Sequence, residues 1–252
     1  MPIDLSIVIP AWNEAARLPS SLEQLRAFRE GLALDVEILL VVEPSADATL
    51  EIAQAFAARA PYFQVIANPV HGGKGFATRT GMLRAQGDYV FYMDADLSVP
   101  LGEMLGFLEE FKARPELHVL VGNRAHAQSR ITRRQTLLRQ RMGQLFNRVL
   151  QGLALVSLAD TQCGFKAFRR EAAREIFSRQ TLDGFAFDVE VLLLAQGLGY
   201  PVADLPVEWI NAPESKVNIL ADSVRMLLDS ARLRRRVEKA LAEKPLFRNY
   251  EG

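Results

Sequence analysis

The sequence predicts an α/β fold with a mixed, mainly parallel sheet, in a single domain that ends in an amphipathic helix. Short apolar runs alternate with helical patterns from residue 5 to residue 93, as in right-handed βαβ units. One of these runs, Tyr89 to Met93, leads directly into two carboxylates, and ligands of open α/β sheets bind at such strand ends. No apolar stretch reaches the roughly 18 residues that a membrane-spanning helix needs.

Length and composition are those of a folded domain with a formal net charge of zero. The 252 residues suit one α/β domain with an extension, and 49% hydrophobic residues supply its core. The formal net charge is +0, and no binding motif is present, so we predict no nucleic-acid partner. The single Cys163 excludes an internal disulfide and fits a reducing compartment. We expect a cytoplasmic protein that makes peripheral contact with the cytoplasmic face of a membrane.

The first half of the chain is predicted to contain four strands, each followed by a helix. Pro10 is expected to end the first strand, and Asn13 to cap the helix after it. Ser45 and Asp47 are cap candidates for the second helix. The four strands are predicted at residues 5–9, 36–42, 63–66 and 89–93.

The second half continues the sheet and ends in a basic helix. A helix at 100–112, strands at 117–121 and 207–210, and a turn with a strand at 160–168 extend the domain, which we place at residues 1–215. Residues 216–252 form the predicted helical extension, whose long helix spans about 218–243. That helix suits either an interfacial position on a membrane or packing on the domain with a solvated basic end. Its basic residues are Arg232, Arg234, Arg235 and Arg236.

Asp94 and Asp96 are the candidate metal ligands. They lie one residue apart at the end of the predicted strand 89–93, just before the helix start at Pro100. Mg²⁺ and Mn²⁺ take hard oxygen ligands and usually share such sites with substrate phosphates. We therefore predict a Mg²⁺ or Mn²⁺ site here. The alternative is that one of the two carboxylates only caps the helix.

The loop from Gly72 to Gly75 predicts an anion site. Its glycines allow backbone amides to approach an anion, and Lys74 adds a charge just before a helix. A flexible turn with a solvated lysine is the alternative. The loop lacks the spacing and the Ser or Thr of a Walker A motif, and the first strand lacks a dinucleotide fingerprint. These absences disfavour P-loop NTPases and nicotinamide-dependent oxidoreductases.

An acid-free basic segment follows the fifth strand. No Asp or Glu occurs from Leu117 to Ala159. A segment whose charged residues are all basic attracts phosphate groups or an anionic membrane surface. A solvated helix face is the alternative. The arginines of this segment are Arg124, Arg130, Arg133, Arg134, Arg139, Arg141 and Arg148.

Asp188 is the candidate general base. It lies near the start of a predicted helix, two residues before Glu190, so at most one of the two is expected to point into a site. A first-turn charge that is favoured by the helix dipole is the alternative. A hydroxyl acceptor would need such a base, whereas a phosphate monoester, with a second pKa of about 6, is already anionic near neutral pH.

Taken together, these motifs resemble those of the inverting glycosyltransferases of family 2, which have the GT-A fold. Within the family the chain looks closest to dolichyl-phosphate and polyprenyl-phosphate β-glucosyltransferases. The resemblance covers roughly residues 5 to 230, and Asp160–Lys166 is its most specific motif. The matching segments are Ser6–Glu14, Gly73–Ala77 with Gly81, Asp94–Leu97, Gly122–His126, Asp160–Lys166, Phe187–Glu190 and Ser215–Val217.

The resemblance implies a metal-dependent hexosyltransferase that moves glucose from a UDP-linked donor to a dolichyl- or polyprenyl-phosphate-like acceptor. Asp96 would bind the metal, with Asp94 sharing its shell. Arg124 would act in catalysis, as would Asp188 with a hydroxyl acceptor. The acceptor phosphate would be held by Arg124, Arg133 and Arg134. The donor nucleotide would be bound by Pro10, Ala11, Trp12, Glu14, Glu43, Lys74, Asp94, Ala95 and Asp96.

Two departures from the family pattern keep alternatives open. The chain reads Val42-Glu-Pro-Ser45 where the family usually has Asp-Asp-Gly-Ser, so Glu43 would replace the second Asp. The C-terminal transmembrane helices of some relatives have no counterpart in the sequence. A glycosyltransferase with a soluble acceptor and a catalytically weak module that binds nucleotide or lipid phosphate are therefore the alternatives. A sugar-1-phosphate nucleotidyltransferase is disfavoured because its glycine-rich signature is missing after the first strand.

Overall fold

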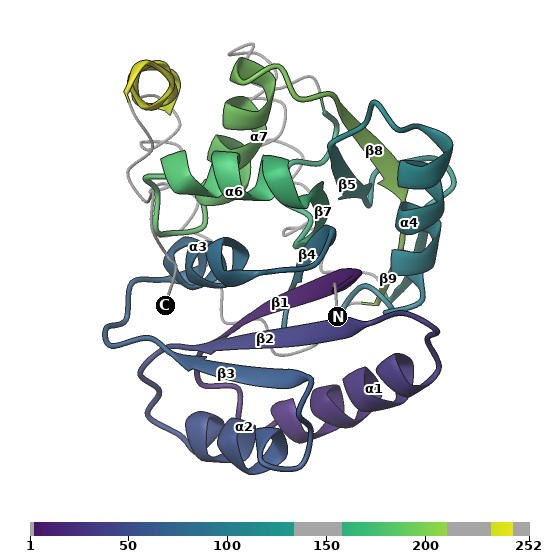
Figure 1. Cartoon of the computed structure of the whole chain (residues 1–252), viewed down its shortest axis with the longest axis vertical. Helices are drawn as coiled ribbons and strands as arrows, with labels where there is room; N and C mark the ends of the chain where they lie inside the picture. Colours follow the sequence, from purple (N-terminus) through teal and green to yellow (C-terminus); the bar gives the residue numbers. More distant parts are fainter. Residues whose placement is uncertain (1–2, 134–157, 211–232, 244–252) are drawn as a thin grey trace.

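The computed structural model describes residues 3–133, 158–210 and 233–243. Within them, a seven-stranded sheet in the order β3-β2-β1-β4-β7-β5-β8 lies between two layers of helices (Figure 1). α1 and α2 cover one face, and α3, α6 and α7 cover the other. Buried apolar residues form one cluster on each face. The α/β class with a mixed, mainly parallel sheet is confirmed.

The first half forms the parallel part of this sheet. β1, β2 and β3 pair in parallel, and β4 pairs in parallel with β1, so the carboxyl ends of the four strands share one edge. Their residues are mostly apolar and buried on both faces, as expected for a parallel sheet under helices. The elements are β1 (Leu5–Ala11), α1 (Leu18–Glu30), β2 (Val36–Val42), α2 (Thr49–Ala57), β3 (Phe63–Ala67), α3 (Lys74–Arg84) and β4 (Tyr89–Met93).

The second half adds the antiparallel part. β7 is inserted between β4 and β5 and runs antiparallel to both, and β8 forms the edge beside β5. The predicted strand at 207–210 is β9, which pairs with β6 in a separate two-stranded ribbon. The elements are α4 (Glu103–Ala113), β5 (Val119–Asn123), β6 (Arg130–Arg133), β7 (Phe165–Arg169), α6 (Arg170–Arg179), α7 (Phe187–Gly197), β8 (Val202–Pro206) and β9 (Glu208–Ile210).

Two local predictions in the first βα unit were wrong. β1 continues through Pro10 to Ala11, because β4 pairs only with Leu5–Val8 and Pro10 therefore has no second neighbour strand to donate to. Asn13 does not cap α1. Its φ is 54°, in the left-handed region that Asn tolerates, and its Oδ1 accepts the amide of Ala46 at 2.7 Å. α1 begins five residues later, at Leu18.

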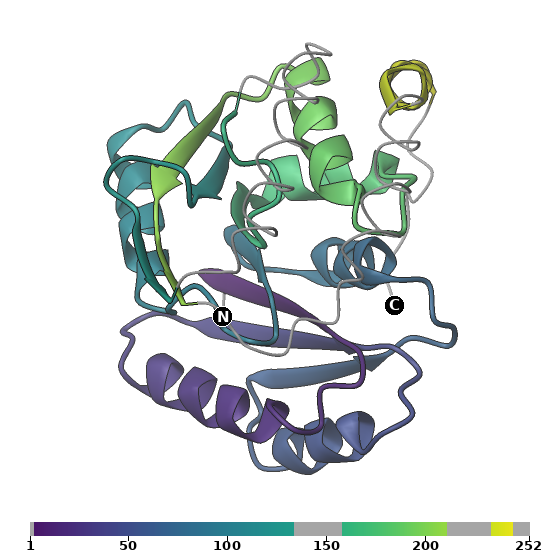
Figure 2. The same ribbon diagram turned by 180° about the vertical axis from the view of Figure 1, so that it is seen from behind.

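The C-terminal helix lies beside α6 and α7 (Figures 1 and 2). Residues 233–242 are helical, and Leu233 and Val237 are buried in the cluster that includes α7. Arg179 donates to the carbonyl of Ala240 at 2.9 Å. The described turns of the basic helix thus pack on the domain, while Arg234, Arg235 and Arg236 are exposed. The rest of the predicted extension lies outside the described residues. Among those described, no helix is long and apolar enough to cross a membrane.

Candidate active site

Asp94 and Asp96 lie in a tight turn directly after β4, as predicted. The amide of Leu97 donates to the carbonyl of Asp94 at 3.1 Å, and Leu97 has a φ of 50°. Asp96 Oδ1 accepts the amide of Ser98 at 2.9 Å, and Arg17 lies 3.8 Å from Asp96 Oδ2. The Asp94 side chain is 40% exposed and that of Asp96 is 22% exposed. Both carboxylates can therefore meet a ligand at this edge of the sheet.

Lys74 connects the glycine-rich loop at residues 72–75 to the turn that carries Asp94. It is the first residue of α3, and its Nζ lies 2.7 Å from Asp94 Oδ1. Burial lowers the pKa of Lys74, but the nearby carboxylates of Asp94 and Asp188 outweigh this and raise the pKa above its ordinary value. The site thus holds a permanent cation beside the first carboxylate.

The donor set fits a divalent cation that is completed by a phosphate-bearing ligand. Partial loss of hydration and the nearby Asp96 carboxylate raise the pKa of Asp94, and the ammonium of Lys74 offsets this only in part, so a further cation would favour the ionised carboxylate. Within the described residues, no group of three or more His, Cys, Asp or Glu could hold a metal. Mg²⁺ is commonly held by one or two carboxylates together with substrate phosphates, and Asp94 and Asp96 match that pattern.

The glycine-rich loop binds an anion, as predicted, but the anion is a carboxylate of the chain itself. The amides of Gly72 and Gly73 each donate to Glu43 Oε1 at 2.9 Å. His71 Nδ1 lies 2.6 Å from Glu43 Oε2. Glu43 follows β2 and is 2% exposed, so its carboxylate occupies the position that we had expected a substrate anion to fill.

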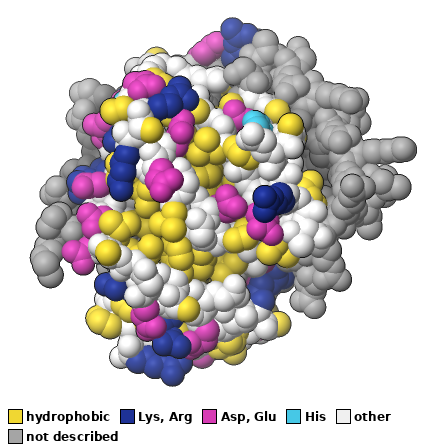
Figure 3. Space-filling view, turned by 90° about the vertical axis from the view of Figure 1, so that its right-hand side faces the viewer, with side chains coloured by type: hydrophobic (Ala, Val, Ile, Leu, Met, Phe, Trp, Pro, Cys, Tyr) yellow, Lys and Arg dark blue, Asp and Glu magenta, His cyan; other side chains and the backbone are white. Residues whose placement is uncertain are grey.

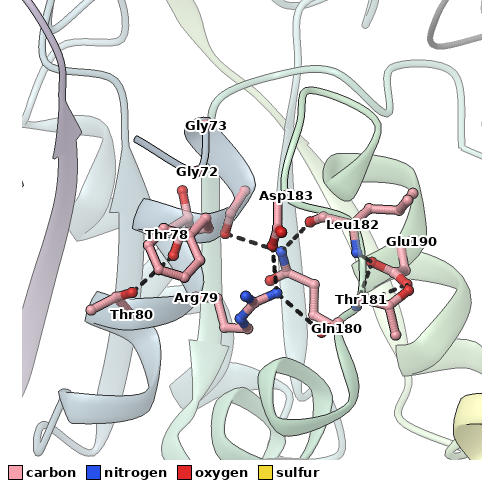
Figure 4. Close-up of polar contacts among 12 residues, drawn as sticks. Gly72, Gly73, Thr78, Arg79, Thr80, Gln180, Thr181, Leu182, Asp183 and Glu190 are labelled. Atoms are coloured by element: carbon pink, nitrogen blue, oxygen red, sulfur yellow. Dashed lines mark hydrogen bonds and ion pairs between the residues drawn. The ribbon is translucent and has the colours of Figure 1, made fainter. Parts of the chain in front are cut away.

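The glycines also allow close packing on the loop between α6 and α7 (Figure 4). A Cβ on Gly73 would lie 2.9 Å from the carbonyl oxygen of Asp183, and one on Gly75 would lie 2.6 Å from that of Leu182. Phe76 donates its amide to Asp183 at 3.1 Å, and Arg79 contacts the Asp183 carboxylate at 2.8 Å. The start of α3 is thus held by backbone contacts as well as by side chains.

The predicted nucleoside residues lie in two loops that bond to each other. The amide of Glu14 donates to Thr49 Oγ1 at 2.7 Å, and Trp12 Nε1 donates to the carbonyl of Pro44 at 3.1 Å. The Trp12 ring, 40% exposed, stacks on His71 with centroids 4.5 Å apart. Pro10 and Ala11 end β1, and Ala95 is buried between the two aspartates. Their contact with a nucleotide stays a prediction.

Arg124 lies near the Asp94 turn, since both line one pocket. Its Nε and one Nη donate to the carboxylate of Asp160 at 2.7 and 2.9 Å, and its Cζ lies 5.7 Å from the ring centre of Trp209. Burial alone would raise the pKa of Asp160, but Arg124 outweighs it and the pKa is lowered. Of the other predicted acceptor residues, Arg133 ends β6 and its side chain is not described, and Arg134 lies outside the described residues.

One pocket brings the carboxylate and the guanidinium together. Asp94 and Arg124 both line it, and Trp209 of β9 lies beside them. The side of the molecule that carries α4 and β9 presents hydrophobic side chains gathered between charged ones (Figure 3). The full lining is Met93, Asp94, Ser98, Val99, Arg124, Cys163, Gly164 and Trp209. The pocket lining therefore includes one carboxylate, which suits a cation-bridged phosphate, and one guanidinium, which suits a bare anion.

Asp188 lies in a buried ion pair. Its Oδ1 contacts Lys166 Nζ and accepts the hydroxyl of Tyr92 at 2.5 Å. Lys166 is 0% exposed and Asp188 is 2% exposed. Glu190 is buried too, but its carboxylate accepts the amides of Thr181 and Leu182, so the two acids bond to different parts of the core. Asp188 as a general base stays a prediction.

Sequence reasoning missed three residues of the site. His71 and Trp209 gave no signal because their partners, Glu43 and Arg124, lie 28 and 85 residues away in the chain. Lys166 ends the motif Asp160–Lys166, but its buried ion pair was not predicted. A lysine inside an apolar strand does indicate a buried charge that needs a partner, and Asp188 is that partner.

Comparisons with known proteins find similar sequences over most of the chain. The model of the family described as "Glycosyl transferase family 2" matches residues 6–177. The dolichyl-phosphate beta-glucosyltransferase of Dictyostelium discoideum is 32% identical over 247 residues, which are 92% of this chain and 75% of that protein. The human dolichyl-phosphate beta-glucosyltransferase is 30% identical over 224 residues, 84% of this chain and 69% of that protein.

Solved structures with the same fold have been crystallised with metal and nucleotide. Glucosyl-3-phosphoglycerate synthase from Mycobacterium tuberculosis, in complex with Mn²⁺, UDP and glucosyl-3-phosphoglycerate, matches 96% of this chain and 81% of that one, with a TM-score of 0.65 and 18% identity. The same enzyme with Mn²⁺ and UDP-glucose matches 94% and 79%, with a TM-score of 0.68 and 17% identity. At this identity the likeness shows the fold alone.

Proposed function

The chain belongs to glycosyl transferase family 2, and from that premise we propose that it transfers glucose from UDP-glucose to a polyprenyl or dolichyl phosphate. The two curated relatives described above are dolichyl-phosphate beta-glucosyltransferases and support both the sugar and the acceptor. The enzyme class is a hexosyltransferase. Asp94 and Asp96 would serve the donor, and Arg124 would serve the acceptor.

The observation that carries this proposal is the pocket shared by Asp94 and Arg124. In this transfer the donor diphosphate and the acceptor phosphate, both anions, must come close together. Cations at the site are needed to offset their repulsion. Lys74 supplies one fixed cation on the donor side, and Arg124 supplies another on the acceptor side. Asp160 uses the Nε edge of the guanidinium, and a guanidinium has five N–H donors, so its other edge suits an acceptor phosphate.

The reaction is a single displacement at the anomeric carbon. An oxygen of the acceptor phosphate forms the new bond to that carbon, the bond to the UDP oxygen breaks with its electron pair, and the configuration inverts. Negative charge grows on the leaving diphosphate, and the ammonium of Lys74, which lies beside Asp94, would stabilise it. A divalent cation, when bound, supplies Lewis-acid stabilisation of the same charge, and Asp94 and Asp96 are the residues that would hold it.

A phosphate acceptor removes the need for a general base. Its second pKa of about 6 leaves the attacking oxygen ionised near neutral pH. Asp188, the candidate base, already accepts from Lys166 and Tyr92 in the core. This arrangement favours the phosphate acceptor over a hydroxyl acceptor.

The surroundings of Arg124 favour a lipid over a soluble acceptor. Trp209 lies against its guanidinium, and Ile131, which pairs with Trp209 in the β6–β9 ribbon, is 43% exposed. Ile210 of the same ribbon is 42% exposed. A phosphate that carries a hydrocarbon chain would meet the Trp209 ring beside its cation, with Ile131 as the cross-strand neighbour of that ring.

The test is a transfer assay with two acceptors and an acceptor-free control under one set of conditions. Purified protein is incubated with radiolabelled UDP-glucose and Mn²⁺ or Mg²⁺, and with polyprenyl phosphate, 3-phosphoglycerate or no acceptor. We expect label in the lipid fraction only with polyprenyl phosphate, and none after EDTA treatment. Label in 3-phosphoglycerate would instead support the soluble-acceptor alternative, and UDP binding without any transfer would support the weak binding module.

A further inference from the structure

Glu43 occupies an unusual position for a carboxylate beside a substrate site. It is the first residue after β2, at the edge of the sheet where Asp94 lies, yet its side chain is 2% exposed. Its oxygens accept the amides of Gly72 and Gly73 and contact the imidazole of His71. Three consecutive residues of one loop thus bond to one carboxylate.

This loop leads directly into the cation of the donor side. Gly73, whose φ of 106° only glycine adopts readily, precedes Lys74, and Lys74 Nζ lies 2.7 Å from Asp94. Glu43 therefore fixes the backbone one residue before the side chain that meets the carboxylate. A shift of these amides would move the point from which the Lys74 side chain extends.

The opposite side of the loop has independent support. The segment after α6 holds the start of α3 through the Phe76 amide, and Arg79 donates to the carbonyl of Gln180 at 3.2 Å (Figure 4). Because these contacts do not involve Glu43, α3 itself should persist when Glu43 is changed. The effect of such a change should then be confined to residues 71–74.

We propose that Glu43 is a positioning residue for Lys74, so that it acts on the diphosphate of the donor and not on its base. The inference rests on the proposed function, because it assigns Lys74 to the leaving diphosphate. It differs from the expectation that Glu43 contacts the nucleoside. The Glu43 carboxylate already bonds to two amides and an imidazole of the chain. Its oxygens are therefore engaged by the loop and do not face a nucleobase.

The decisive variant is Glu43→Gln, which keeps the shape but loses the charge and turns one acceptor oxygen into an NH₂ donor. Glu37→Gln is the matched control. Glu37 belongs to the same strand, is 3% exposed, and accepts the Gln86 amide at 2.6 Å, but it lies near the opposite end of β2. Six residues of extended strand separate the two carboxylates by about 20 Å.

Calorimetry with UDP and with uridine separates the two roles of Glu43. We expect Glu43→Gln to weaken UDP binding by about tenfold, as expected when one charge-assisted contact is misplaced, and to leave uridine binding within about twofold. Glu37→Gln should alter neither. The double variant Glu43→Gln/Lys74→Met should bind UDP like Lys74→Met alone, because a residue that acts through Lys74 has no effect without it. Equal loss of UDP and uridine binding, or additive losses in the double variant, would overturn the proposal.

Hydrogen exchange gives a readout that does not depend on nucleotide binding. The amides of Gly72 and Gly73 should exchange at least about tenfold faster in Glu43→Gln than in the wild type, and those of α3 should keep their protection. Glu37→Gln should leave both sets unchanged. Unchanged exchange at Gly72 and Gly73 would overturn the positioning role. Faster exchange in a protein that binds no UDP would instead place the error in the proposed function.

Discussion

Replacing Lys166 by Met should destabilise the protein strongly, because it leaves the buried carboxylate of Asp188 without its cation. The Lys166 side chain is 0% exposed, and its ammonium contacts Asp188 and donates to the carbonyl of Cys163 at 2.9 Å. Met fills a similar volume but carries no charge. Asp188 would then be left with Tyr92 as its described side-chain donor.

The magnitude follows from the burial of both partners. Removing one member of a buried ion pair costs about 3–5 kcal/mol in the free energy of unfolding. In a chain of this size, each kcal/mol shifts the melting temperature by about 2–4 °C, so Lys166→Met should melt about 6–20 °C below the wild type. Loss of the Cys163 contact adds to this, because that turn carries Gly164, which packs against Asp94.

The assay is thermal unfolding followed by circular dichroism, with a charge-free double variant as the control. Lys166→Met/Asp188→Asn removes both charges and keeps an acceptor for Tyr92, so we expect it to regain at least half of the lost stability. Such a recovery reflects the coupling of two contacting residues. A shift below about 2 °C for Lys166→Met would refute the reasoning, because the pair would then contribute no more than a surface ion pair.

Three further predictions concern charge. Asp96→Asn should abolish metal-dependent transfer with the fold intact, and equal UDP affinity with Mn²⁺ and with EDTA in the wild type would contradict the metal site. Asp160, whose pKa Arg124 lowers against the effect of burial, contributes stability above the pKa of the unfolded chain, about 3.9. The melting difference between wild type and Asp160→Asn should therefore hold from neutral pH to about pH 5 and shrink as the folded carboxyl is protonated below about pH 4; a constant difference at pH 3 would exclude this. Exposed Arg234, Arg235 and Arg236 should bind anionic vesicles at low salt and release them at high salt, since the Debye length is about 8 Å at physiological ionic strength. Substituting all three by Gln should abolish vesicle binding, and vesicle binding that survives would place the contact elsewhere.

Local patterns were sufficient for the parallel half of the fold. The strand Tyr89–Met93 has the predicted bounds, because a short apolar run between a turn and two acidic residues is typical of a buried strand. β8 was missed because its sequence contains Asp204 and ends in Pro206, and such residues are tolerated at the edge of a sheet, where a strand has one partner. Sequence periodicity cannot reveal an edge position.

Contacts over long sequence distances could not be predicted. The antiparallel insertion of β7 between β4 and β5 depends on sheet order, which the strand patterns do not encode. Glu43 shows the same limit within the site. The glycine pattern correctly indicated an anion at residues 72–73, but it could not indicate that this anion is a carboxylate of the chain 29 residues earlier.

The most direct test of the shared pocket is two-substrate kinetics of Arg124→Gln, which removes the charge and leaves a donor for Asp160. A guanidinium that binds the acceptor phosphate through charge-assisted bonds contributes about 1.5–3 kcal/mol. We therefore expect the KM for polyprenyl phosphate to rise about 10- to 100-fold and the KM for UDP-glucose to stay within about twofold. Arg130 is an exposed arginine of the same acid-free segment, and Arg130→Ala should change neither KM. A rise in the donor KM without a rise in the acceptor KM would place Arg124 on the diphosphate and contradict the assignment of Arg124 to the acceptor.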